Sequence, residues 1–233
     1  GVVNNASFAP APAPLAPGSI AAVFGSNLND GSIITSSTIG PDGKLVTTLG
    51  GSSATVNSIP APIFYSTPGQ IGIQIPFELA NLSFGTLRVT VAGETSEPVN
   101  IPISNFAPGI FTVNQQGTGL AAALHEDGVT PVTGGNPAHL NEVIVFFGTG
   151  LGVASPPLAT GERSGGNPTS TPATATVGGV AAIVEFSGTA PGFVGLNQIN
   201  VRIPAGIATG PAVPVVFNIG GQAANPVTIP VAP

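Results

Sequence analysis

One short strand pattern occurs twice in this chain, and it constrains the fold more than any other feature. Residues 70–76 are QIGIQIP and residues 198–204 are QINVRIP. In both copies aliphatic residues alternate with small or polar ones, which is the period of a half-buried β-strand, and a proline ends the run. The first residues of the two copies are 128 positions apart (198 − 70). The sequence therefore predicts two tandem copies of one β-domain.

Other elements recur at similar offsets. They are closing strands at 98–103 and 226–231, and strands that run into Phe-Gly-(Ser/Thr)-x-Leu at 24–28 and 147–151. Each closing strand contains one proline, Pro102 or Pro230. Because proline has no backbone N–H to donate, we expect both prolines at a sheet edge or a bulge.

The spacing of strands and turns predicts the fold class. About seven short strands per half, separated by Gly, Pro, Asn and Asp turns at intervals of roughly 8–12 residues, are typical of antiparallel sandwiches. We predict two immunoglobulin-like β-sandwiches, residues 1–104 and 105–233. The first begins with a Pro-rich arm (1–17), and the second carries a polar insertion near 155–172. Only residues 77–82 allow a turn or two of helix.

Charge and sulfur content narrow the classes of partner. Charged residues make up 6% of the chain, against about 25% in ordinary soluble domains. The four cations are scattered singly and the net charge is −6, so we expect neither a nucleic-acid partner nor an anionic membrane surface. The chain has no Cys, which excludes disulfides and thiolate metal sites, and no Met. Such a chain tolerates an oxidising exterior.

Composition also predicts where the protein works. Low-charge β chains rich in Thr, Ser, Gly and Pro are typical of exported proteins, so we expect a secreted or cell-surface protein. No apolar run approaches the roughly 18 residues of a membrane span. The sequence starts at Gly1 and not at Met, which suggests a removed leader or a fragment.

Two patterns resemble catalytic or cofactor-binding motifs. Residues 117–122, GTGLAA, match the G-x-G-x-x-A dinucleotide fingerprint, but that fingerprint needs a following helix. The glycines and prolines between 128 and 137 forbid a helix of sufficient length, so a turn is the favoured interpretation. His125 and His139 are the only imidazoles. We expect no enzyme activity and no cofactor, and keep a hydrolase as the least favoured hypothesis.

A metal site in this chain can use only oxygen and imidazole ligands. The best candidates for a calcium site are Glu126 and Asp127, but they lack the D-x-D-x-D spacing of a dedicated calcium loop. A turn at the end of a hairpin explains them equally well, so we expect no metal.

The first residues have strand character. The prolines at positions 10, 12, 14 and 17 predict that the segment which follows these first residues is extended. The N-terminal strand is either the first edge strand of its own domain or a strand donated to a neighbouring subunit. The residues of this candidate self-assembly strand are Val2, Val3, Asn4, Asn5, Ala6, Ser7 and Phe8. We also predict that the side chains of Gln70 and Gln198 pair with buried backbone groups.

Several motifs together resemble a known family. They are residues 15–28, 61–65 and 70–76 in the first half, and 107–112, 145–152, 190–196 and 198–204 in the second. Together they resemble the Solibacter-type uncharacterised C-terminal domain of secreted acidobacterial proteins. Each half is also similar, more weakly, to immunoglobulin-like domains of the IPT/TIG type. The resemblance implies a bacterial source, export and an immunoglobulin-like fold, and it supplies no catalytic residues.

Two functional hypotheses follow. The first is a non-enzymatic structural or adhesive protein of the exterior, the subunit of an extracellular filament (a homopolymer) assembled by β-strand addition. The alternative is a non-catalytic module of a larger secreted protein that binds polysaccharide or another cell-surface protein through its loops, such as 155–172. Sugar-binding sandwiches usually present aromatic platforms, and the chain has no Trp and a single tyrosine, Tyr65. That composition counts against a lectin-like site.

Overall fold

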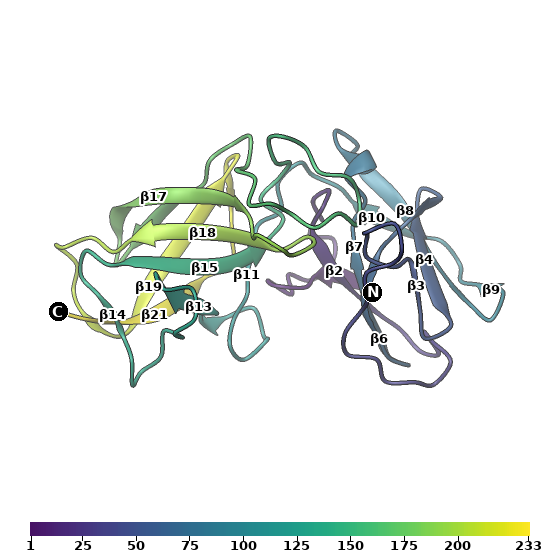
Figure 1. Cartoon of the computed structure of the whole chain (residues 1–233), viewed down its shortest axis with the longest axis horizontal. Helices are drawn as coiled ribbons and strands as arrows, with labels where there is room; N and C mark the ends of the chain where they lie inside the picture. Colours follow the sequence, from purple (N-terminus) through teal and green to yellow (C-terminus); the bar gives the residue numbers. More distant parts are fainter.

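The chain forms two β-sandwiches in tandem, described here from a computed structural model of residues 1–233 (Figure 1). The one helical element is a 3-10 turn, η1 (Phe77–Leu79). The all-β class and the tandem antiparallel sandwiches predicted from the sequence are confirmed, and so is the short helical turn. No helix in the structure is long and apolar enough to cross a membrane.

Domain one, residues 1–104, packs two antiparallel sheets against each other. One sheet has the order β1 (Val2–Asn4), β2 (Ile20–Phe24), β7 (Gln70–Gln74), β6 (Ile63–Ser66). The other has the order β10 (Val99–Pro102), β8 (Phe84–Val91), β4 (Ser52–Val56), β3 (Thr48–Leu49), with β5 (Ile59–Pro60) beside β4 and β9 (Glu94–Thr95) beside β8. Between the sheets lies a core of 16 buried residues, the first Val2 and the last Ile103.

Domain two, residues 105–233, folds one continuous path of hydrogen-bonded strands around a core of 22 buried residues. The path is β11 (Gly109–Ile110), β15 (Val143–Thr149), β18 (Asn197–Arg202), β17 (Val180–Thr189), β16 (Thr174–Val177), β19 (Gly210–Ile219), β21 (Val227–Ala232), β12 (Gly119–Leu120). Beside it lie β13 (Ala123–His125), β14 (Ala138–His139) and β20 (Gln222–Ala223).

Strand β17 connects the two layers of domain two. Its first residues pair with β16 and the rest pair with β18, with a register irregularity between Val184 and Phe186. Inside the core, the rings of Phe146 and Phe217 pack edge to face, with their centroids 5.0 Å apart. This core begins at Ile110, so the predicted join between the domains lies between the two cores.

The repeated sequence elements are hydrogen-bonded neighbours in both domains. In domain one β7 pairs with β2, and in domain two β18 pairs with β15. The sequence repeat is therefore the repeat of one strand pair. Pro102 lies in the edge strand β10, and Pro230 lies opposite a register irregularity in β19. Both prolines thus sit where the sequence predicted, at an edge or a bulge.

The two copies of the repeated strand differ in burial. Strand β18 alternates between buried and half-buried residues, as predicted, but β7 is buried continuously after Gln70. Gly72 lies under the ring of Tyr65, because a Cβ at Gly72 would stand 2.3 Å from Tyr65 Cε1. Gln74 is covered by domain two and has no exposed surface. The face of this sheet that points away from the core is therefore the face on which the domains meet.

Candidate binding site between the two domains

Gln74 joins the domains through a fully buried amide. Its Nε2 donates to the carbonyl oxygen of Gly18 at 3.3 Å, and its Oε1 accepts from the backbone N–H of Gly161 at 2.7 Å. The carbonyl of Gly161 accepts in turn from Leu45 N–H at 2.9 Å. Gly161 belongs to the 155–172 segment, drawn in green in Figure 1, so the centre of this insertion is engaged within the chain. Pairing at both ends offsets the cost of burying the amide.

Two threonine hydroxyls add polar contacts across the same boundary. Thr160 Oγ1 accepts from Phe77 N–H at 2.9 Å and donates to Glu78 Oε2 at 2.6 Å. Thr149, which is fully buried, accepts from Ile20 N–H at 2.9 Å. Thr149 lies in the repeated Phe-Gly-Thr element, so a residue of the repeat is used here for contact between domains. These paired groups hold the two sandwiches in one arrangement.

The N-terminal strand is packed on its own chain. Strand β1 pairs antiparallel with β2, and Asn4 Nδ2 donates to the carbonyl of Ala107 in domain two at 2.9 Å. Beyond β1, a Cβ at Gly117 would stand 2.1 Å from the carbonyl oxygen of Ser7. This arrangement is the intramolecular alternative predicted from the sequence. Donation of the strand Val2–Phe8 to another subunit stays a prediction.

The glycine pattern that mimics a dinucleotide fingerprint has a structural explanation. Gly117 lets Ser7 approach, and Gly119 opens β12, which pairs in parallel with β21. No helix follows it. Residues 117 and 118 form a bend and residues 119 and 120 form β12, so the turn expected for this stretch is short and leads directly into a strand.

A cleft of about 860 Å³ opens between the two domains. One wall comes from domain one and the N-terminal segment, and the other from the loop after β11. Its lining residues are Asn5, Ala6, Phe8, Phe24, Tyr65, Gln70, Phe111, Thr112, Asn114, Gln115 and Gln116. All of them are uncharged. Three residues of the predicted self-assembly strand are therefore in the wall of this cleft.

Tyr65 is the hydrogen-bonded centre of the domain-one wall. Its hydroxyl donates to Asn5 Oδ1 at 2.9 Å and accepts from Gln70 Nε2 at 2.7 Å. Burial raises the pKa of Tyr65 to about 12, although the hydrogen bond from Gln70 acts in the opposite direction. The three side chains form a chain of fixed donors and acceptors. Sequence composition had counted the single tyrosine against a lectin-like site, yet Tyr65 lies at the centre of the domain-one wall of this cleft.

Aromatic faces and unpaired amides complete the lining. The Phe24 side chain is 41% exposed, and Phe111 on the opposite wall is half-buried. The side-chain amides of Gln115 and Gln116 are exposed and make no hydrogen bond within the protein. Gln115 has a φ of 55°, and its N–H donates to the Thr112 carbonyl at 3.0 Å, which fixes the loop that presents it. The cleft thus offers flat apolar surfaces next to free donors and acceptors.

The prediction for the repeated glutamines is wrong. Both side chains pair with other side chains, Gln70 with Tyr65 and Gln198 with Asn200 at 2.9 Å. The glutamine that satisfies buried backbone groups is Gln74, which sequence reasoning missed. Its counterpart in the second copy is Arg202, a partly exposed residue. The sequence did contain one signal for this role, because Gln74 is uncharged at the position where the second copy has Arg202.

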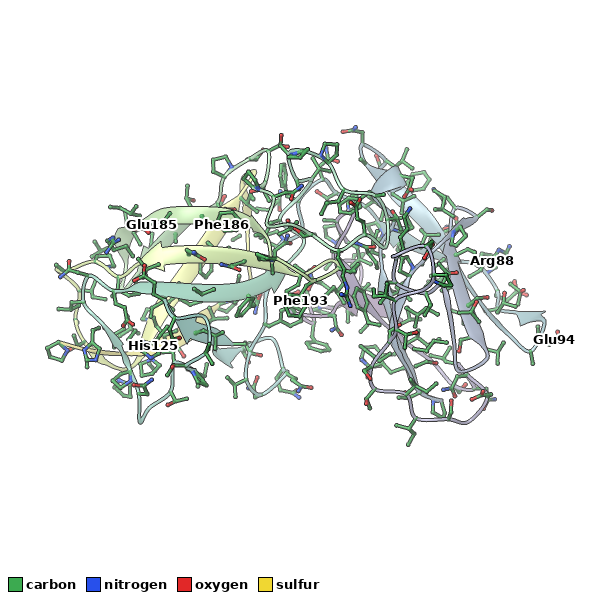
Figure 2. All side chains as sticks on the ribbon, in the orientation of Figure 1. Arg88, Glu94, His125, Glu185, Phe186 and Phe193 are labelled. Atoms are coloured by element: carbon green, nitrogen blue, oxygen red, sulfur yellow. The ribbon has the colours of Figure 1, made fainter.

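His125 lies at the end of domain two that is farther from domain one (Figure 2). Its Nδ1 lies 2.5 Å from Glu142 Oε1, and its side chain is 13% exposed. Burial opposes protonation of the ring. The hydrogen bond to Glu142, the Asn136 carbonyl and the nearby carboxylates outweigh burial and raise the pKa of His125. The ring holds together the two ends of the 125–142 segment.

The candidate calcium ligands lie in the same region. Asp127 Oδ2 accepts from Thr130 Oγ1 at 2.5 Å, and its Oδ1 accepts from the N–H groups of Val129 and Thr130. The side-chain bond from Thr130, followed by the backbone bonds, lowers the pKa of Asp127 to about 2. Glu126 is its chain neighbour, and the structure brings no three His, Cys, Asp or Glu side chains together. Asp127 closes a turn.

Comparison with known proteins gives a distant likeness to an immunoglobulin-like tandem. No family model and no curated protein matches the chain, so the family resemblance stays a prediction. Solved structures similar to it include the I9-I11 tandem from titin, with 9% sequence identity and a TM-score of 0.24. That likeness covers 94% of this chain and 62% of the titin chain. The class of the fold, tandem β-sandwiches, rests on the sheets described above.

Proposed function

We propose that this chain is a non-enzymatic adhesive protein of the bacterial exterior, which binds a polysaccharide or a surface protein in the cleft between its domains. The cleft is the observation that carries the proposal. Its volume of about 860 Å³ is within the range of roughly 300–1,000 Å³ typical of ligand sites. The low content of charged residues and the absence of cysteine and methionine support a location outside the cell.

Preorganisation of the cleft supports a binding role. The domains are held by the buried amide of Gln74, and the domain-one wall is held by the Tyr65 hydrogen bonds. A site that is already ordered loses less conformational entropy on binding. Two sandwiches held side by side therefore suit an adhesive protein that binds its ligand between them.

Adhesion measurements on purified surface material test this proposal. Beads coated with the chain are expected to attach to a purified polysaccharide or surface protein, and the double variant Phe24→Ala/Phe111→Ala is expected to detach. The matched control is Phe84→Ala, since Phe84 is 68% exposed and lies outside the cleft. Equal attachment of the double variant and the wild-type chain would show that the cleft is not the adhesive surface.

Self-assembly by strand addition is a second proposal, and the position of β1 favours it. Strand β1 is a three-residue strand at the edge of its sheet, followed by proline at positions 10, 12 and 14. The segment after β1 is not extended throughout, as the prolines had predicted, because residues 10–13 form a turn in which the N–H of Ala13 donates to the Pro10 carbonyl at 3.1 Å. An edge strand on such a proline-containing connection can pair with β2 of its own chain or of another copy. A filament subunit would use the second pairing.

A disulfide between register partners distinguishes the two pairings, because the chain has no other cysteine. Val3 lies opposite Ala22 in the β1–β2 ladder, so Val3→Cys and Ala22→Cys place two thiols within bonding reach. Oxidised chains that migrate as monomers in a denaturing gel would contradict strand addition. A ladder of covalent oligomers, formed only with both cysteines present, is the result that strand addition requires.

A further inference from the structure

We infer that the ligand of the interdomain cleft is an uncharged carbohydrate chain. This inference deepens the proposed function and rests on it, since it names the class of ligand for the same site. Three properties of the lining lead to it: neutrality, paired donors and acceptors, and aromatic surface on both walls.

Neutrality of the lining excludes charged ligands on energetic grounds. None of the eleven lining residues is Asp, Glu, Lys, Arg or His. A ligand carboxylate, sulfate or ammonium would lose part of its hydration in the cleft and find no opposite charge in return, which is costly. An uncharged ligand has no such penalty.

The polar groups of the lining match hydroxyl chemistry. Five of the lining residues carry side-chain amides: Asn5, Gln70, Asn114, Gln115 and Gln116. Each amide has both a donor end and an acceptor end, and a hydroxyl group both donates and accepts. Neighbouring hydroxyls on a sugar ring can therefore bind one amide at both ends. The exposed amides of Gln115 and Gln116, which have no partner in the protein, are the groups available first.

The aromatic rings match the apolar faces of a sugar. Pyranose rings present C–H groups on their faces, and these pack on aromatic side chains. Phe24 lines the cleft from domain one and Phe111 lines it from domain two. A ligand that uses both rings must contact both domains, so a chain of several sugar units fits the lining better than a single sugar.

Tyrosine fluorescence gives a direct test, because Tyr65 is the only tyrosine and the chain has no tryptophan. The chain is titrated with cellohexaose, mannohexaose and xylohexaose, and in parallel with hexagalacturonate, a chitosan hexamer and an unstructured hexapeptide. We expect a saturable change at Tyr65 with at least one neutral hexasaccharide. The affinity should change less than about twofold between low and high salt, because no ion pair forms.

Amide variants connect the signal to the lining. Gln115→Ala/Gln116→Ala is expected to weaken binding of the neutral hexasaccharide about tenfold, the equivalent of about 1.4 kcal/mol. Gln222→Ala is the control, since Gln222 is exposed on β20 and outside the cleft. Equal weakening by the control would overturn the assignment.

The titrations separate this inference from the proposed function. Saturable binding of the acidic, basic or peptide probe at Tyr65, with none for the neutral hexasaccharides, would overturn the carbohydrate inference and leave an adhesive cleft standing. No saturable binding by any of the probes, together with no bead attachment, would overturn both.

Discussion

Replacing Gln74 by methionine tests whether the buried amide holds the two domains together. Methionine keeps the unbranched shape and removes both hydrogen bonds, so the variant isolates the polar contribution from the effect of a cavity. The N–H of Gly161 loses its acceptor at 2.7 Å, and the Gly18 carbonyl loses a weaker donor at 3.3 Å. Gly161 is itself buried, so its N–H has no solvent partner in exchange.

The expected loss follows from these two groups. A buried donor left without a partner costs about 1–3 kcal/mol, and the longer bond to Gly18 adds less than about 1 kcal/mol. Burying a thioether in place of an amide returns part of this sum. We therefore expect Gln74→Met to lower the free energy of unfolding by about 2 kcal/mol. If the chain melts as one unit, its melting temperature should fall by roughly 4–8 °C.

Denaturant unfolding followed by circular dichroism measures this loss, with Gln198→Met as the matched control in the second copy of the strand. Gln198 is half-buried and pairs only with the Asn200 side chain, so its replacement should cost less than about 0.5 kcal/mol. If the single unfolding transition of the chain splits into two in Gln74→Met, the domains have begun to unfold independently. Equal costs for the two variants would refute the role assigned to Gln74.

Three further outcomes are expected. Protonated His125 stabilises the fold because its pKa is raised above 6.5, so that stabilisation should be complete below pH 6.5 and disappear as the pH rises through the raised value; denaturation midpoints of His125→Gln should lack this slope. Gly117→Ala should destabilise the chain and expose its N-terminus to protease more than Gly128→Ala, since both glycines have positive φ but only Gly117 has a backbone oxygen 2.1 Å from the added Cβ. Ultraviolet titration of Tyr65 should give a pKa near 12, with stability falling between pH 10 and that value; ionisation near pH 10 would contradict its burial.

Local pattern predicted the elements of this fold because strand alternation, proline stops and glycine turns are short-range properties. The strand pattern repeated at Gln70 and Gln198 predicted two tandem domains. Pro102 and Pro230 predicted an edge strand and a bulge, which are β10 and the irregularity in β19. The class of tandem β-sandwiches follows from such signals alone. An alternating strand pattern identifies only the face of the strand that packs against a core. It does not say what covers the other face.

The cleft depends on contacts between residues that lie far apart in the sequence. Tyr65 meets Asn5 across 60 positions, and Gln74 meets Gly161 across 87. Only the packed structure shows that the outer face of β7 is an interface, since its sequence matches the half-exposed β18. The sequence by itself determined the strands, their repeat and the neutral composition. The tertiary structure decided which neutral side chains meet, because docking of one sandwich on the other turned separate surface residues into the walls of one cleft.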